Sequence, residues 1–208
     1  MKAYIVYCHP DPGSFTAAVR DRAVSALEAT GHLVRVADLY GDGFDPAMSR
    51  QERLQHKAPP APPPDIARYC ENLLWCDTLV FIYPTWWSGQ PAMLTGWFDR
   101  VLRRGVAWEL PEGASRIEAR LTNVRRVVAI TSHGSPKLLN VLEGESGRRV
   151  IGRGVRVLCN RLARTTWLAM YNIDHATQAD REAFLDRVNR KLRGLSPVPS
   201  AGAGAETS

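Results

Sequence analysis

Two adjacent tryptophans, Trp86 and Trp87, stand between a short apolar run and a helical pattern. The run 79–83 is too short for a buried helix and predicts a central strand, which Pro84 ends because proline has no N–H for the ladder. Ligands bind at the strand ends of open α/β sheets. Two indoles at that place indicate a site for a flat, stacking ligand, and the alternatives are packing and a subunit contact.

The turn after the first predicted strand is a second place for chemistry. Residues 3–8 are an apolar, β-rich run, and a turn cluster from His9 to Ser14 ends it. Ser14 fits the N-cap of a helix whose apolar stripe ends at Gly31. The free N–H groups and the positive dipole end of that helix suit a phosphate or pyrophosphate.

A third turn, 131–134, follows the strand predicted at 124–132. Its small residues allow the backbone to approach the edge of a ring closely. Because the carboxyl ends of parallel strands meet at one edge of the sheet, we expect the three turns to converge there. Together they describe a flavin site, with the phosphate on the first turn and the isoalloxazine between the second and third.

The remaining segments supply the elements that position these turns. Strand patterns and helical patterns alternate along the chain, which implies right-handed crossovers and an α/β fold with a doubly wound, five-stranded parallel sheet. We expect one domain over 1–193 and a disordered tail over 194–208. Residues 40–64, with five prolines among 59–64, predict a surface loop rather than a ligand for a partner. The further strands are predicted at 33–39 and 165–171, and the further helices at 66–75, 92–102, 147–162 and 178–192.

The composition of the 208 residues, 45% hydrophobic and 23% charged, is typical of a soluble globular protein. No apolar run reaches the length of a membrane span and the N-terminus enters a strand directly, so we expect a cytoplasmic protein without membrane insertion. The four cysteines form no CxxC pair, which favours reduced, buried thiols and argues against a metal site. The net charge of +6 without a basic stripe argues against nucleic acid and favours anionic ligands.

The segment 84–101, PTWWSGQPAMLTGWFDRV, closely resembles the signature of the NAD(P)H:quinone oxidoreductase (DT-diaphorase) family, which includes ancillary oxidoreductases of bacterial potassium-efflux systems. Residues 38–40 and 44–46 match it too, and the turn 131–134 looks like the family's Thr-Thr-Gly-Gly. The resemblance, over about residues 2–193, implies a flavodoxin-like fold with strand order 2-1-3-4-5 and a homodimer. It also implies a tightly held flavin, NAD(P)H as co-substrate and two-electron, ping-pong hydride transfer to quinones.

Carried over position by position, the resemblance implies three groups of cofactor-binding residues. The first contacts the phosphate and ribose, the second lines the isoalloxazine, and the third faces the N1 and C2 edge, where N–H donors stabilise negative charge. Arg181 and Asp99 match a family pair that would favour FAD over FMN. The three groups are His9, Ser14, Phe15 and Thr16; Pro84, Thr85, Trp86, Trp87 and Ser88; and Thr131, Ser132 and Gly134.

The family's catalytic tyrosine and histidine are not carried over, because Leu139 and Glu145 stand in their places. His133 replaces a glycine of the family turn and is either a proton donor, which its titration range suits, or a bulky wall of the pocket. His56 and His175 are interpreted as surface loop residues. Since the cofactor carries the redox chemistry, a missing side-chain acid need not abolish activity.

The leading interpretation is a flavin-dependent NAD(P)H:quinone oxidoreductase. The alternative is a flavin-binding redox regulatory subunit of a potassium-efflux or other partner protein. An electron-shuttling flavodoxin is disfavoured, because such shuttles are usually acidic and lack the paired tryptophans. Reduction of azo dyes or nitro compounds would use the same site. A phospho-receiver and an ordinary dinucleotide fold are disfavoured, because the acidic pair after the first strand and the GxGxxG pattern are missing.

Overall fold

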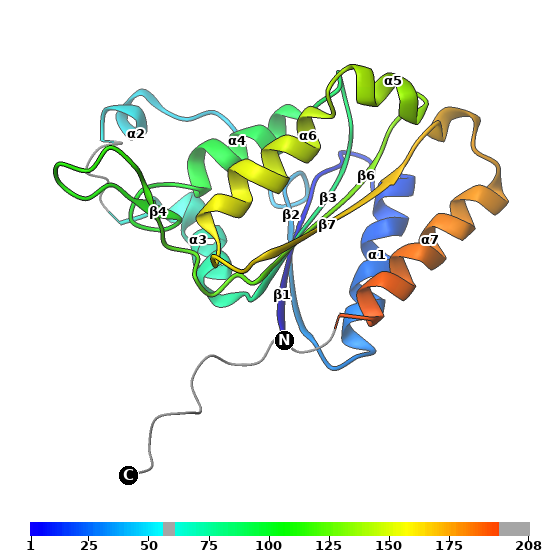
Figure 1. Ribbon diagram of the computed structural model, residues 1–208, viewed down its shortest axis with the longest axis horizontal. Coiled ribbons are helices and arrows are strands. Elements are labelled where there is room, and N and C mark those ends of the chain that lie inside the picture. Colours follow the sequence, from blue (N-terminus) through cyan, green and yellow to red (C-terminus); the bar gives the residue numbers. More distant parts are fainter. Residues whose placement is uncertain (56–60, 196–208) are drawn as a thin grey trace, which may run out of the picture.

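Five parallel strands form the central sheet of the computed structural model, which describes residues 1–55 and 61–195 (Figure 1). Their order is β2-β1-β3-β6-β7, which confirms the predicted topology. All seven residues of β3 are buried, because this central strand has helices on both faces. The strands are β1 (Lys2–Tyr7), β2 (Leu33–Asp38), β3 (Thr78–Pro84), β6 (Arg126–Ser132) and β7 (Arg164–Met170).

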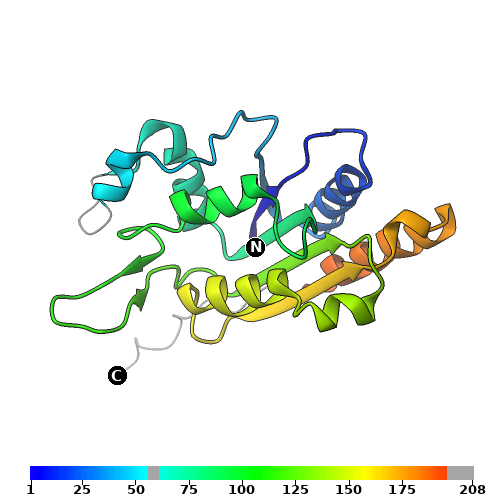
Figure 2. The same ribbon diagram turned by 90° about the horizontal axis from the view of Figure 1, so that it is seen from above.

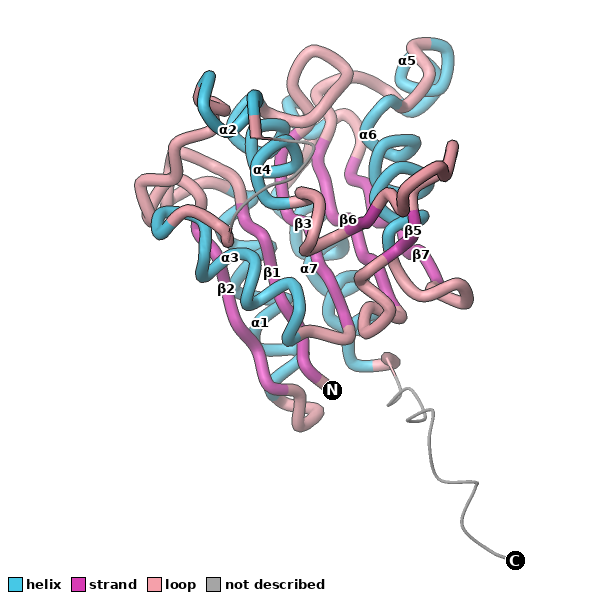
Figure 3. The backbone as a smooth tube through the Cα atoms, turned by 90° about the vertical axis from the view of Figure 1, so that its left-hand side faces the viewer, coloured by secondary structure: helices cyan, strands magenta, loops and turns pink. Residues whose placement is uncertain are grey.

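Helices cover the two faces of the sheet as separate layers (Figure 2). One layer consists of α1 (Phe15–Glu28) and α7 (Gln178–Arg193), whose apolar sides are buried against the sheet. The other contains α3 (Pro64–Trp75) and α4 (Ala92–Val101), which pack around the fully buried Trp97. Figure 3 looks onto this second layer. Helices predicted from apolar spacing therefore each bury one side, as that spacing requires.

The loop predicted over 40–64 contains a helix that the prediction missed. Ser49 and Glu52 form a capping box, in which each side chain bonds the backbone of the other residue. This box starts a short helix, α2 (Arg50–Leu54). The Ser-x-x-Glu spacing is the sequence signal for it, and the surrounding prolines and glycines obscured that signal.

The helix predicted over 147–162 is interrupted. It starts as α6 (Ser146–Arg149), widens into a π-helical turn (Val150–Val155) and ends in a 3-10 turn (Arg156–Leu158). The glycines in this stretch weaken a regular helix, because glycine loses more conformational freedom on folding than other residues. A separate helix, α5 (Lys137–Leu142), precedes it.

A small hairpin and a 3-10 turn were not predicted. The hairpin pairs β4 (Trp108–Glu109) with β5 (Glu118–Ala119), and two-residue strands carry no readable periodicity. The 3-10 turn Ile173–His175 links β7 to α7. His56 and residues 196–208 of the predicted tail lie outside the described residues. Within the described ranges, no helix is long and apolar enough to cross a membrane.

Candidate active site

The three turns named from the sequence lie side by side at one edge of the sheet. The ring of His9 in the first turn lies 6.1 Å from that of Trp86 in the second. The Thr85 N–H donates to the Ser132 carbonyl at 2.8 Å, and the Thr85 and Thr131 hydroxyls are 2.9 Å apart. These contacts join turns that lie 46 or more residues apart in the sequence, as the parallel topology requires.

The first turn presents the start of α1 to the site. The Ser14 hydroxyl accepts the Ala17 N–H at 3.2 Å, which makes Ser14 the N-cap as predicted. The Asp11 carboxylate accepts the Gly13 N–H at 2.8 Å and holds the turn closed. No acidic residue lies in the first turn of α1 itself, where an acid would neutralise the helix dipole, and Asp11 lies in the turn before the helix. This geometry suits an anion such as a phosphate.

The second turn is an exposed and strained aromatic platform. Trp87 is fully exposed and Trp86 is 40% exposed. Trp87 and Ser88 have positive φ angles of 49° and 58°, which non-glycine residues adopt only when their surroundings hold them there. Paired backbone bonds between Trp86 and Gly89 and a bond from the Ser88 hydroxyl to Glu143 at 2.5 Å hold this turn. Strain of this kind clusters at ligand sites.

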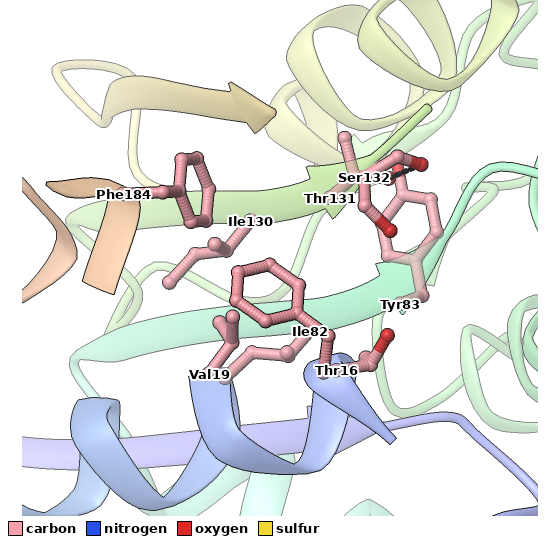
Figure 4. Close-up of a pocket in the computed structure, with 9 residues that line it drawn as sticks. Thr16, Val19, Ile82, Tyr83, Ile130, Thr131, Ser132 and Phe184 are labelled. Atoms are coloured by element: carbon pink, nitrogen blue, oxygen red, sulfur yellow. Dashed lines mark hydrogen bonds between the residues drawn. The ribbon is translucent and has the colours of Figure 1, made fainter. Parts of the chain in front are cut away.

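Between the first and third turns lies a small hollow with a volume of about 10 Å³, room for about one water molecule. Figure 4 shows the hydroxyls of Thr16, Thr131 and Ser132 at one end and the apolar side chain of Phe184 at the other. A ring system would lie across such a hollow rather than sink into it. The lining residues are Phe15, Thr16, Val19, Ile82, Tyr83, Ile130, Thr131, Ser132 and Phe184.

Arg181 lies beside the first turn, whereas Asp99 does not. The Arg181 guanidinium is 5.9 Å from the centre of the Phe15 ring. The centres of the Phe15 and Phe184 rings are 6.0 Å apart. Asp99 belongs to α4, in the helical layer on the opposite face of the sheet from α7. Within one chain the structure therefore does not bring the predicted pair together, because the sheet separates the two helices.

His133 is buried in the third turn, with contacts that the sequence did not indicate. Its Nδ1 lies 2.6 Å from Asn140 Oδ1 and its ring stacks on Tyr171, with centroids 4.7 Å apart at 22°. The Tyr171 hydroxyl donates to Glu145 at 2.7 Å. Burial lowers the pKa of His133 from its ordinary value, against the opposing effects of Asn140 and of nearby carboxylates. Asn140 and Tyr171 thus join the site although no motif marked them, and so does Glu145, which stands where the resembling family has its catalytic histidine.

The remaining candidate residues and the cysteines differ in their exposure. Leu139, which stands where the family has a tyrosine, is 44% exposed on α5. His175 is exposed on the turn before α7, as expected. All four cysteines are free and buried, and burial raises the pKa of Cys8 to about 12 and that of Cys70 to about 11. Among the described residues, no group of three or more His, Cys, Asp or Glu could hold a metal ion.

A parallel sheet of this order, with three turns gathered at its carboxyl edge, defines a doubly wound α/β protein, a class of fold in which ligands bind at the strand ends. A family model described as "Flavodoxin-like fold" matches residues 1–193. The chain therefore belongs to the flavodoxin-like fold family.

Relatives and solved structures agree with this assignment. The chain is 33% identical over 156 residues to "NAD(P)H dehydrogenase [quinone] 1" of Cavia porcellus, covering 67% of this chain and 56% of that protein. It is similar to the structure of an NAD(P)H:quinone oxidoreductase from Methanothermobacter marburgensis, with 30% identity, a TM-score of 0.81 and coverage of 94% and 99% of the two chains. Smu.1420 from Streptococcus mutans gives 27% identity, a TM-score of 0.82 and coverage of 94% and 100%. The chain spans a little over half the length of the curated relatives it matches.

Proposed function

We propose that this chain is a flavin-dependent oxidoreductase that transfers electrons from NAD(P)H to a quinone or a related acceptor. One observation carries the proposal: an exposed, strained tryptophan platform lies beside the capped start of α1 and across from the third turn. The residues present fit a flavin, because indoles suit a flat ring and a helix start suits a phosphate. Relatives named as quinone dehydrogenases support the choice of acceptor.

The protein's part in this reaction is to bind and orient the flavin and to cover one side of its ring. A bound flavin supplies reversible two-electron chemistry. Trp86 and Trp87 offer apolar faces that exclude water from one side of a ring. The Thr85 and Thr131 hydroxyls and the backbone of the third turn offer hydrogen bonds to its polar edge. The start of α1, with Ser14 and Thr16, would hold the phosphate tail of the flavin.

We propose FAD rather than FMN as the flavin, with Arg181 and Phe15 beside the first turn as support.

We also propose a homodimer, because Trp87, Leu138 and Leu142 leave large apolar surfaces exposed around the mouth of the site. A pairing of Asp99 with Arg181 would then have to cross between the two copies. The four buried thiols without a disulfide support a cytoplasmic location.

Purified protein with added FAD tests the activity directly. It should oxidise NADPH or NADH only when a quinone is present, at a rate that falls at least about tenfold in the Trp86→Ala, Trp87→Ala double variant, which loses two stacking contacts. Leu33→Ala, an exposed apolar side chain on β2, is the control and should match the wild type. Flavin bound tightly without any oxidation of either nucleotide would instead favour a redox regulatory subunit.

A further inference from the structure

The His133 side chain is fixed in place at the edge of the ring site, the place between the second and third turns that is proposed for the isoalloxazine ring. It is only 4% exposed. The backbone N–H of His133 donates to the Met170 carbonyl at 2.8 Å, and the backbone carbonyl of His133 accepts the Ile173 N–H at 3.0 Å. Both partners lie at the end of β7 and the turn after it, so the third turn is bonded to the neighbouring strand. These two bonds hold the backbone, while the imidazole itself is held by Asn140 at Nδ1 and by stacking on Tyr171.

The neighbouring amide determines which ring nitrogen carries the proton. Asn140 Nδ2 donates to the carbonyls of Ser135 at 3.1 Å and Pro136 at 2.9 Å, which fixes the orientation of the amide. Its Oδ1 therefore faces His133 Nδ1, at 2.6 Å. An amide oxygen only accepts, so Nδ1 must carry the hydrogen. In the neutral ring, Nε2 is then the free basic atom.

The free nitrogen points toward the ring site. His133 Nε2 lies 3.5 Å from the Thr85 hydroxyl, which pairs with the Thr131 hydroxyl at 2.9 Å. These two hydroxyls belong to the turns proposed to hold the isoalloxazine. A proton gained or lost by His133 is therefore exchanged on the side of the cofactor.

Several elements surround the imidazole. Tyr171 of the β7 end stacks on it and is itself held by Glu145, which Arg148 bonds at 3.0 Å. Burial lowers the pKa of His133, with the hydrogen bond to Asn140 and the charges of Glu145 and Glu143 opposing it. The resting ring is therefore neutral at pH 7. The other neighbours are Trp167, at 6.4 Å between ring centroids, and Asp174, whose carboxylate lies against Gly134.

We propose that His133 takes up one proton at Nε2 when NAD(P)H delivers its electrons to the site, and returns that proton to the electron acceptor. This inference rests on the proposed function. NAD(P)H gives two electrons and one proton and leaves as NAD(P)⁺, so the site gains one negative charge. An N–H bond forms at Nε2 with a proton from solvent and balances that charge.

The second half of the cycle restores the neutral ring. A quinone takes the two electrons and the first proton, the Nε2–H bond breaks, and its proton forms the second O–H bond of the hydroquinone. Atoms and charge then balance, and His133 is ready for another turnover. Asn140 and Tyr171 act through His133 as positioning residues.

The resting state of His133 can be tested without any flavin. In cofactor-free protein at pH 7, ¹⁵N NMR of the imidazole should show a neutral ring protonated at Nδ1 and bare at Nε2. Asn140→Asp places a carboxylate against Nδ1, which stabilises the charged ring, so this variant should show an imidazolium at the same pH. A wild-type ring protonated at Nε2, or charged at pH 7, would overturn the proposal.

Proton counting tests the step itself. Protein loaded with FAD or FMN, reduced by NADH in weak buffer with a pH indicator, should take up about one proton per flavin at pH 7. His133→Gln should take up close to none, and so should Asn140→Asp, in which His133 is already charged. His32→Gln replaces another buried histidine, next to Thr30 after α1, and should match the wild type.

Two results separate the possible failures. Equal uptake in the wild type and in His133→Gln would overturn the role of His133 while leaving the oxidoreductase function intact. A protein that binds neither flavin would remove the proposed function and this step with it, and the NMR spectrum would still decide the tautomer of His133.

Discussion

Arg181 lies beside the turn that is proposed to hold phosphate, and it is the residue on which the choice of flavin depends. FAD carries a second phosphate that would meet this cation, whereas FMN ends at the first. Arg181→Ala should weaken FAD binding about tenfold, equivalent to about 1.4 kcal/mol, and leave FMN binding within about twofold. Flavin fluorescence titration measures both dissociation constants.

Arg190→Ala is the matched control for that titration, because Arg190 is exposed on the same helix, farther from the first turn. It should leave both dissociation constants unchanged. Unaltered FAD binding in Arg181→Ala would remove the support for FAD and leave FMN as the better choice.

At the scale of the element, Gly96 allows α4 to approach the loop around Pro46. A Cβ atom at Gly96 would lie 2.3 Å from Pro46 Cβ and from its carbonyl oxygen, so one of the two segments would have to move. Gly96→Ala should lower the free energy of unfolding by about 1–3 kcal/mol through overpacking. Urea unfolding monitored by circular dichroism measures this loss.

Gly154 provides the matched control in the π-helical turn, since a Cβ there would meet nothing within 4 Å. Gly154→Ala should be neutral or stabilising by about 0.5 kcal/mol, because alanine restricts the unfolded chain. If the two alanine variants were equally stable, the close approach of α4 to Pro46 would be wrong.

At the scale of the whole molecule, Arg100 joins three segments. This buried guanidinium bonds Glu52 of α2 at 2.9 Å, the Asp45 carbonyl at 2.7 Å and Asp65 of α3 at 2.6 Å. Burial alone would raise the pKa of Glu52, but hydrogen bonds from Ser49 and Arg100 outweigh it and lower the pKa below its usual value. The folded state therefore favours the ionised carboxylate.

The sign of the resulting pH dependence follows from that lowered pKa. The stabilisation is fully present above the pKa of Glu52 in the unfolded chain, about 4.3, and is lost as the pH falls through the lower folded value. Glu52→Gln should be less stable than the wild type at pH 7, and the difference should shrink below about pH 4. Glu71→Gln, which replaces an exposed carboxylate on α3, is the control. If the stability difference between Glu52→Gln and the wild type stayed constant down to pH 2, the ionic role of Glu52 would be wrong.

The sequence was sufficient to predict the five strands and their parallel order, because each strand is an apolar run and helices separate consecutive strands. The three turns of the site followed from the strand ends. The surroundings of His133 did not, since Glu145 and Tyr171 are 26 residues apart and meet only because β7 ends beside the third turn. The positive φ of Trp87 and the two-residue strands of the hairpin also leave no pattern in the residue types.

Titration of cofactor-free protein with FAD and with FMN tests most directly whether a flavin lies across the three turns. We expect about one flavin to bind per chain with its fluorescence quenched by the indoles, and the Trp86→Ala, Trp87→Ala double variant to bind it at least about tenfold more weakly. If protein refolded with an excess of both flavins retained neither, or if the double variant bound flavin as tightly as the wild type, the proposed site would be wrong.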